Sequence, residues 1–177
     1  MQMKLEAQNS LNKMDEKLYI IKKSEIHGNG VFAKCPIKKG TQIMEYLGET
    51  LGKDEANKRG LEYEAQAEIT KDGSVYIFEL DEETFIDGKF DYNDAKYINH
   101  SCQTNCESVQ EGNQIFFYAT KDIKAGEELL FNYGYALEHF LDHKCKCGSL
   151  NCCGYIVSEE DRPKLRKILQ NRNRRKK

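Results

Sequence analysis

Short runs of β-branched and aromatic residues, broken by glycine, asparagine or aspartate, dominate the hydrophobic pattern of this chain. Runs of this kind are typical of short strands joined by tight turns. The pattern predicts strands over residues 18–21, 42–47, 75–80, 114–119 and 128–131, and residues 96–98 also have a strand-like composition.

Three segments have helical character: residues 53–67, 136–143 and 158–170. The last one opens with three acidic residues and closes with cations, which suits the two ends of a helix dipole, although Pro163 leaves its start open. Strands and helices do not alternate regularly, so a doubly wound parallel sheet is disfavoured and a mainly β fold with few helices is predicted.

A length of 177 residues with 39% hydrophobic residues fits one globular domain. The chain has 27 basic and 29 acidic residues, but nine basic and no acidic residues lie between positions 162 and 177. The preceding part therefore has 18 basic against 29 acidic residues, a charge of about −11. An acidic body suits a basic partner, whereas a basic terminal run is most often a solvated segment.

Seven cysteines are present, and four of them lie between positions 145 and 153. Such clustering suits metal ligation better than it suits a disulfide framework. Free thiols of this kind favour a reducing compartment. No stretch approaches 18 apolar residues, and the first ten residues do not form a signal peptide, so we expect an intracellular protein without a membrane span.

A metal site is predicted by the Cys-x-Cys-x4-Cys spacing of Cys145, Cys147 and Cys152. Three thiolates suit a tetrahedral Zn²⁺, which needs one more ligand. The spacing leaves five candidates open for that ligand: Cys102, Cys106, Cys153, His139 and His143.

Three other segments are candidates for ligand contacts. Gly28 and Gly30 flank Asn29, a spacing that lets backbone amides approach a ligand, although a plain turn has the same composition. Asn99-His100 follows an apolar run, and the pair is equally compatible with a hydrogen-bonded core. Aromatic residues occupy every second position at Phe131, Tyr133 and Tyr135, so in a strand their rings lie on one side. Such a row could line a substrate channel or form part of the core.

Together, five collinear segments resemble the SET-domain protein-lysine methyltransferases with a post-SET zinc segment. They are Gly28-Asn29-Gly30, Glu45-Tyr46-Leu47-Gly48-Glu49, Asn99-His100-Ser101-Cys102, residues 128–135 and the cysteine motif. The resemblance implies a fold of small β sheets with a C-terminal pseudoknot. It divides the chain into an N-terminal extension (1–16), a SET domain (17–136), a post-SET zinc segment (137–157) and a basic C-terminal helix and tail (158–177).

The same resemblance implies roles for individual residues. S-adenosylmethionine would be bound by Gly28, Asn29, Gly30, Tyr97, Asn99, His100 and Tyr133. A lysine channel on the opposite face would be lined by Tyr46, Tyr76, Phe131, Tyr133 and Tyr135, with Tyr133 at the reacting groups. Cys102 would become the fourth zinc ligand. Phenylalanine rather than tyrosine at position 131 would favour a di- or trimethylated product.

Two departures from the family pattern affect these expectations. Many relatives have Arg-Phe where this chain has Lys96-Tyr97, and Gly-Asn where it has Tyr92-Asn93. No cysteine-rich segment precedes Tyr19, unlike several histone-specific branches.

The expected function is methylation of a lysine on a histone or histone-like basic tail. A ribosomal or other non-histone substrate, or an inactive SET module acting as a scaffold, are the alternatives. The expected location is chromatin in a eukaryote, or the cytoplasm or a host cell for a bacterial protein. The basic terminal segment could also contact nucleic acid.

Overall fold

The structure, a computed structural model, describes residues 17–70 and 76–175. The expected N-terminal extension, Val75 and the last two residues lie outside these ranges.

Short strands make up most of the regular structure among the described residues. They are β1 (Tyr19–Lys23), β2 (Asn29–Ala33), β3 (Gln42–Glu45), β4 (Glu49–Gly52), β5 (Ile77–Glu79), β6 (Thr84–Asp87), β7 (Asn99–His100), β8 (Cys106–Glu111), β9 (Gln114–Ala119) and β10 (Leu130–Phe131). The helices are α2 (Lys53–Thr70) and α3 (Arg162–Arg175), with 3-10 turns η1 (Asp94–Tyr97) and η2 (Leu137–His139).

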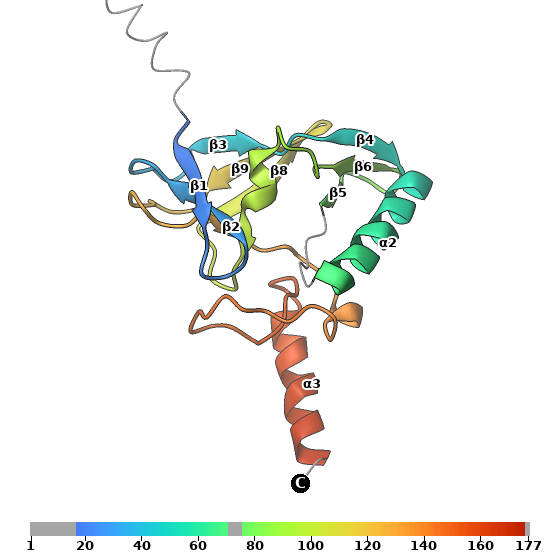
Figure 1. Ribbon diagram of the computed structural model, residues 1–177. Coiled ribbons are helices and arrows are strands. Elements are labelled where there is room, and N and C mark those ends of the chain that lie inside the picture. The colour runs from blue at the N-terminus through green and yellow to red at the C-terminus, as the bar shows by residue number, and fades with distance from the viewer. Residues whose placement is uncertain (1–16, 71–75, 176–177) are drawn as a thin grey trace, which may run out of the picture.

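Four small sheets result from the pairing of these strands (Figure 1). The antiparallel sheets have the orders β1-β2, β3-β9-β8 and β4-β6-β5. The fourth is a parallel pair in which Asn99 lies opposite Leu130 and His100 opposite Phe131. This pair brings the Asn-His segment beside the aromatic segment, and the architecture confirms the predicted mainly β fold.

The β-branched runs correspond to β1, β3, β5, β9 and β10, and the 53–67 segment corresponds to α2. Strands β2, β4, β6, β7 and β8 were not predicted. Strand β8 has the sequence CESVQE with mostly exposed side chains, because it forms the edge of its sheet and pairs only with β9. An edge strand of this kind has no apolar run that could be recognised.

Two local predictions were wrong. Residues 96–98 do not form a strand, because the Ile98 amide donates to the Ala95 carbonyl at the end of η1, a turn that buries both side chains. The predicted helix over 136–143 is reduced to η2, which has no buried residue of its own to extend it.

Helix α3 begins four residues later than predicted. The Ser158 hydroxyl accepts from the Asp161 amide at 3.2 Å, and the first helical bond runs from the Leu165 amide to the Asp161 carbonyl. Pro163 therefore lies in the first turn, where its missing N–H has no consequence. Leu165 packs with Phe140 and Val157 in a small second core that joins α3 to residues 137–157.

Beyond this small core, α3 projects away from the sheets, and residues 137–157 lie between it and the β body (Figure 1). The main core gathers side chains from β2, β3, β9 and β10, including Val31, Phe117 and Phe131. None of the helices in the described ranges is long and apolar enough to cross a membrane.

Candidate functional site

The glycine segment runs from the turn after β1 into the start of β2, and Asn99 fixes it. The Asn99 side-chain amide donates to the carbonyls of His27 at 3.1 Å and Asn29 at 3.0 Å, and lies 2.9 Å from a Glu128 carboxylate oxygen. Gly30 leaves space for that carboxylate, since a Cβ there would lie 2.2 Å from it. Asn99 therefore connects the glycine turn to the parallel strand pair.

A cavity of about 510 Å³, here called the polar cavity, opens beside this turn. Six of the seven residues expected to bind the cofactor line it: Gly28, Asn29, Tyr97, Asn99, His100 and Tyr133. The seventh, Gly30, does not line the cavity and serves instead in the close packing against Glu128. Lys23, Lys144, Lys146 and Asp142 also line it, so both signs of charge are available to a ligand.

A second cavity of about 340 Å³, here called the aromatic cavity, contains all five residues expected to line the lysine channel. These are Tyr46, Tyr76, Phe131, Tyr133 and Tyr135, and the sequence analysis missed Phe78, which joins them. Tyr76, Lys96 and Tyr133 line both cavities. Tyr133 therefore lies where the polar and the aromatic cavity meet.

Tyr133 donates two hydrogen bonds, one from its side chain and one from its backbone. Its hydroxyl donates to the Ile98 carbonyl at 3.2 Å, and its amide donates to Nδ1 of His100 at 3.3 Å. Burial, followed by the neighbouring Tyr135, raises the pKa of Tyr133 well above that of a free tyrosine. Burial raises the pKa of Tyr135 to about 12, so both phenols keep their protons at neutral pH.

The same environment keeps His100 neutral. Burial and then the nearby charge of Arg162 lower the pKa of His100 to about 4. With its Nδ1 accepting from Tyr133, the imidazole acts as a fixed hydrogen-bonding group rather than as a proton carrier.

The alternating aromatic residues form a continuous row, although the strand itself ends at Phe131. The ring centroids of Phe131 and Tyr133 are 5.0 Å apart, and those of Tyr133 and Tyr135 are 5.8 Å apart. Phe131 also stacks on Phe78 at 6.0 Å and meets Phe117 edge to face at 4.9 Å. Packing against the core, rather than a continued strand, therefore keeps these rings together.

Tyr46 contributes its ring to the aromatic cavity, but its hydroxyl donates to the Tyr76 carbonyl at 2.8 Å. Burial, followed by the charge of Asp87, raises the pKa of Tyr46 far above its ordinary value. The same Tyr76 carbonyl accepts a second bond from the Gly88 amide at 2.8 Å. Tyr46 therefore fixes the backbone of Tyr76, and its hydroxyl proton is not available to a ligand.

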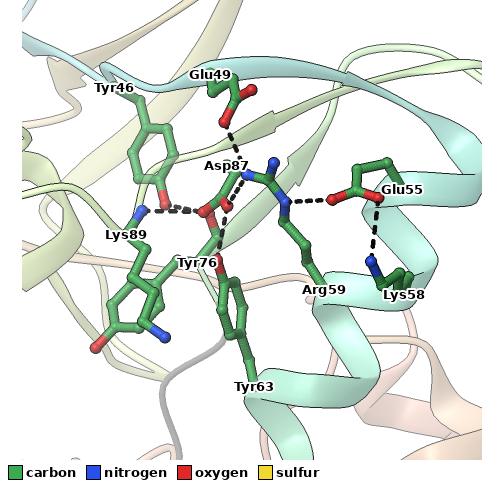
Figure 2. Close-up of polar contacts among 9 residues, drawn as sticks. All are labelled: Tyr46, Glu49, Glu55, Lys58, Arg59, Tyr63, Tyr76, Asp87 and Lys89. Carbon is green, nitrogen blue, oxygen red and sulfur yellow. Dashed lines mark hydrogen bonds and ion pairs between the residues drawn. The ribbon is translucent and has the colours of Figure 1, made fainter.

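An ion-pair network around the buried Asp87, next to Tyr76, was not predicted from the sequence (Figure 2). Asp87 is 1% exposed and accepts from Arg59 at 2.9 Å and from the Tyr63 hydroxyl at 2.6 Å. Arg59 and Tyr63 are four residues apart on α2, and the Tyr63 ring meets the Tyr76 ring edge to face at 6.0 Å. The network thus joins α2 to the side of the aromatic cavity.

The charges in this network determine the state of Asp87. Burial raises the pKa of Asp87, but the bonds from Tyr63, Arg59 and the Lys89 amide outweigh burial and keep the pKa below its usual value. Asp87 is therefore an anion at neutral pH. The spacing of Arg59 and Tyr63 on one helix face was the signal available in the sequence, but nothing in the sequence places Asp87 opposite them.

Four cysteines meet near the polar cavity, which Lys144 and Lys146 line on either side of Cys145 in the sequence. The sulfur atoms of Cys102, Cys145, Cys147 and Cys152, here called the cysteine cluster, all lie within 4.8 Å of one another. The Cys102 and Cys145 sulfurs are 3.9 Å apart, and four sulfurs about 2.3 Å from a tetrahedral Zn²⁺ would be about 3.8 Å apart. The cluster therefore has the composition and spacing that a zinc ion requires.

The other candidates for the fourth ligand lie outside the cluster. The Cys153 thiol bonds to the Tyr155 carbonyl at 3.2 Å, and the Cys106 thiol to the Asn105 side chain at 3.4 Å. The His143 ring packs on Tyr135 with centroids 4.3 Å apart. Cys102 is thus the residue that the fold adds to the three thiols of the motif.

Comparison with known proteins agrees with this geometry. Residues 28–134 match the SET domain family. The variant-silencing SET domain-containing protein of Plasmodium falciparum (isolate 3D7) is 39% identical over 139 residues, which cover 76% of this chain and 5% of that protein. The human histone-lysine N-methyltransferase, H3 lysine-36 specific, is 37% identical over 162 residues, 83% of this chain and 6% of that protein.

A third relative, the histone-lysine N-methyltransferase, H3 lysine-4 specific, of Emericella nidulans (strain FGSC A4), is 36% identical over 140 residues. The aligned part covers 76% of this chain and 11% of that protein. The family match extends over more than half of the chain, so the chain belongs to the SET-domain family. It spans only 5% to 11% of the length of these three relatives.

Proposed function

We propose that this chain transfers methyl groups from S-adenosylmethionine to a lysine of a histone or a histone-like basic tail. The observation that carries the proposal is the position of Tyr133, which lines a polar cavity on one side and an aromatic cavity on the other. Two substrates can then meet at one residue from opposite sides. Two of the relatives described above are named as histone-lysine N-methyltransferases, which supports the same reaction class.

The polar cavity fits the methyl donor. Its volume is ordinary for a small-molecule site, and Gly28, which lines it, has no side chain to keep a ligand from the backbone. The lysines and Asp142 can pair with the carboxylate and ammonium of an amino acid group. Tyr97, Asn99 and His100 complete the proposed binding residues, with Gly30 acting through its packing.

When bound, S-adenosylmethionine supplies an electrophilic methyl group that a neutral lysine amine displaces in line from the sulfur. The residues of the chain align and desolvate the amine. The aromatic cavity disfavours a charged ammonium and so lowers the pKa of the lysine. The Tyr133 hydroxyl donates to Ile98, which leaves its oxygen free to accept a bond from the amine.

Phe131 is proposed to set the number of methyl groups added. Its ring is 6% exposed and packs between Phe78, Phe117 and Tyr133, and it has no hydroxyl to hold the amine or a water molecule. A methylated amine can therefore rotate for a second transfer, and the ring faces attract the methylated cation by about 0.5–2 kcal/mol. The expected product is di- or trimethyl-lysine.

Zinc is the proposed metal of the cysteine cluster, since four thiolates form a closed structural site. Cys102 comes from the loop after β7, next to His100 of the polar cavity, so metal binding would connect residues 145–152 to the cofactor site.

The proposed substrate is basic because the body of the chain is acidic. We propose that the chain acts on chromatin in the nucleus and that residues 162–177, with nine basic and no acidic side chains, contact nucleic acid.

A labelled methyl-transfer assay tests the proposal. Core histones and a whole-cell protein extract are incubated with labelled S-adenosylmethionine and either the native chain or its Tyr133→Phe variant. We expect the label in histones with the native chain and a large loss with the variant. Label only in non-histone proteins would indicate another substrate, and cofactor binding without transfer would indicate an inactive binding module.

A further inference from the structure

Arg162, the first residue of α3, has a buried guanidinium group that is only partly hydrogen-bonded. The residue is 9% exposed, and its Nη1 donates to the Cys102 carbonyl at 2.7 Å. Within residues 17–70 and 76–175, its Nε and Nη2 atoms have no hydrogen-bond partner. A guanidinium does not lose its proton in proteins, so the positive charge stays in place. A buried cation without a counter-charge is strongly unfavourable.

The cysteine cluster, which includes Cys102, is negatively charged when it holds zinc. Four thiolates around a divalent zinc ion carry a net charge of −2. Cys102 connects the two groups, because its amide donates to the Cys147 sulfur at 3.5 Å while its carbonyl accepts from Arg162. The guanidinium is therefore linked to the cluster through a single residue that is itself a ligand.

The packing of α3 holds Arg162 in this place. Leu165, three residues further along, is fully buried against Phe140 and Val157. The other cations around Arg162 on the helix, such as Lys164, Arg166 and Lys167, are exposed. Arg162 thus differs from these three residues, because water solvates their charges but not the charge of Arg162.

We propose that Arg162 is a positioning residue for the metal. It balances the charge of the metal-bound thiolates and fixes the loop that carries Cys102, which makes the first turn of α3 part of the metal site. The proposal rests on the proposed zinc cluster but not on the methyl-transfer activity.

The test compares zinc affinity in three variants of the full chain by competition with a chromogenic chelator. Arg162→Gln keeps a donor for the Cys102 carbonyl but removes the charge, and Arg162→Lys keeps the charge. Lys167→Met removes an exposed charge from the same helix and serves as the matched control. Replacing a group that supports metal ligands typically lowers metal affinity about 10- to 100-fold.

We expect a loss in that range for Arg162→Gln, a smaller loss for Arg162→Lys and no change for Lys167→Met. The absorption spectrum of the cobalt-substituted protein should also shift in Arg162→Gln, because the geometry of Cys102 changes. Far-UV circular dichroism verifies that each variant folds. If Arg162→Gln does not fold, a lower zinc affinity in Arg162→Lys than in Lys167→Met still supports the proposal.

Three results would overturn it: native affinity in Arg162→Gln, equal losses in Arg162→Gln and Arg162→Lys, or an equal loss in the control. The zinc content of the native chain tests the metal site itself. A chain that binds no zinc would refute both the proposed zinc cluster and the role of Arg162. Methyl transfer by the native chain is measured separately, so failure of the proposed activity leaves the Arg162 comparison interpretable.

Discussion

Replacing Asp87 with asparagine tests whether the network around this buried carboxylate stabilises the fold. Asp87 is 1% exposed and accepts charge-assisted bonds from Arg59 and Tyr63, whereas Glu49 accepts from the same Arg59 nitrogen at 2.8 Å but is 50% exposed. The two carboxylates therefore have the same cationic partner and nearly the same distance, and differ in burial. Glu49→Gln is the matched control.

The expected effects follow from that difference. Two weakened charge-assisted bonds at a buried acceptor correspond to a loss of about 3 kcal/mol in Asp87→Asn. An exposed ion pair contributes less than about 1 kcal/mol, so Glu49→Gln should have little effect. For a chain of this size, about 3 kcal/mol corresponds to a decrease in Tm of about 6–12 °C.

The effect should also depend on pH. The folded pKa of Asp87 lies below its unfolded value, so the carboxylate contributes stability above the unfolded pKa, and this contribution is lost as the pH falls through the folded pKa. The difference in stability between the native chain and Asp87→Asn should therefore be largest near pH 7 and begin to decrease below about pH 4.

Urea and thermal unfolding of the native chain and both variants at pH 7 measure these values. Because Tyr63 joins Asp87 to Tyr76, we also expect the KM for a peptide substrate to rise in Asp87→Asn more than kcat falls. Equal losses of stability in Asp87→Asn and Glu49→Gln would refute the argument from burial.

Four further substitutions test the proposed site. Cys102→Ser should lower zinc content and activity together, while Cys153→Ser should leave both nearly unchanged, as measured by metal analysis and methyl transfer; the reverse result would contradict the ligand assignment. Tyr133→Phe should remove most activity, because one hydroxyl bond near the amine is lost, with the circular dichroism spectrum unchanged. Phe131→Tyr should shift the product toward monomethyl-lysine in mass spectrometry, and an exclusively monomethylated product from the native chain would refute the role of Phe131.

Much of the fold could be predicted because short apolar runs mark strands that bury one or both faces. Strand β9, with the sequence QIFFYA, alternates between exposed or half-buried and buried positions and was predicted with its observed bounds. Strand β8 could not be predicted in this way, because its partner β9 covers one edge and most of its side chains face water.

The basic C-terminal segment shows a different limit. Its composition indicates a solvated run, but the structure buries Arg162 and Leu165 at the start of α3. Net charge per segment does not reveal that one cation in nine lies against a carbonyl from a loop 60 residues earlier. Contacts between residues so far apart in the sequence depend on the tertiary fold and cannot be predicted from the local sequence pattern.

The residues of the candidate site and their order could be predicted from the sequence. The contacts between distant residues around the site could not. The resemblance to the SET-domain family implied the two groups of residues, and all of them except Gly30 line the polar or the aromatic cavity. The Asp87 network was missed because Asp87, Arg59 and Tyr63 meet only after α2 packs on β6.

The central claim is that a methyl group passes to a lysine amine at Tyr133, where the two cavities meet. Its most direct test is tandem mass spectrometry of core histones after incubation with the chain and S-adenosylmethionine that has a deuterated methyl group. We predict deuterated methyl groups on the side-chain nitrogen of a histone lysine, mainly as di- or trimethyl-lysine. Histones without label, from a chain that binds both zinc and S-adenosylmethionine, would contradict the account.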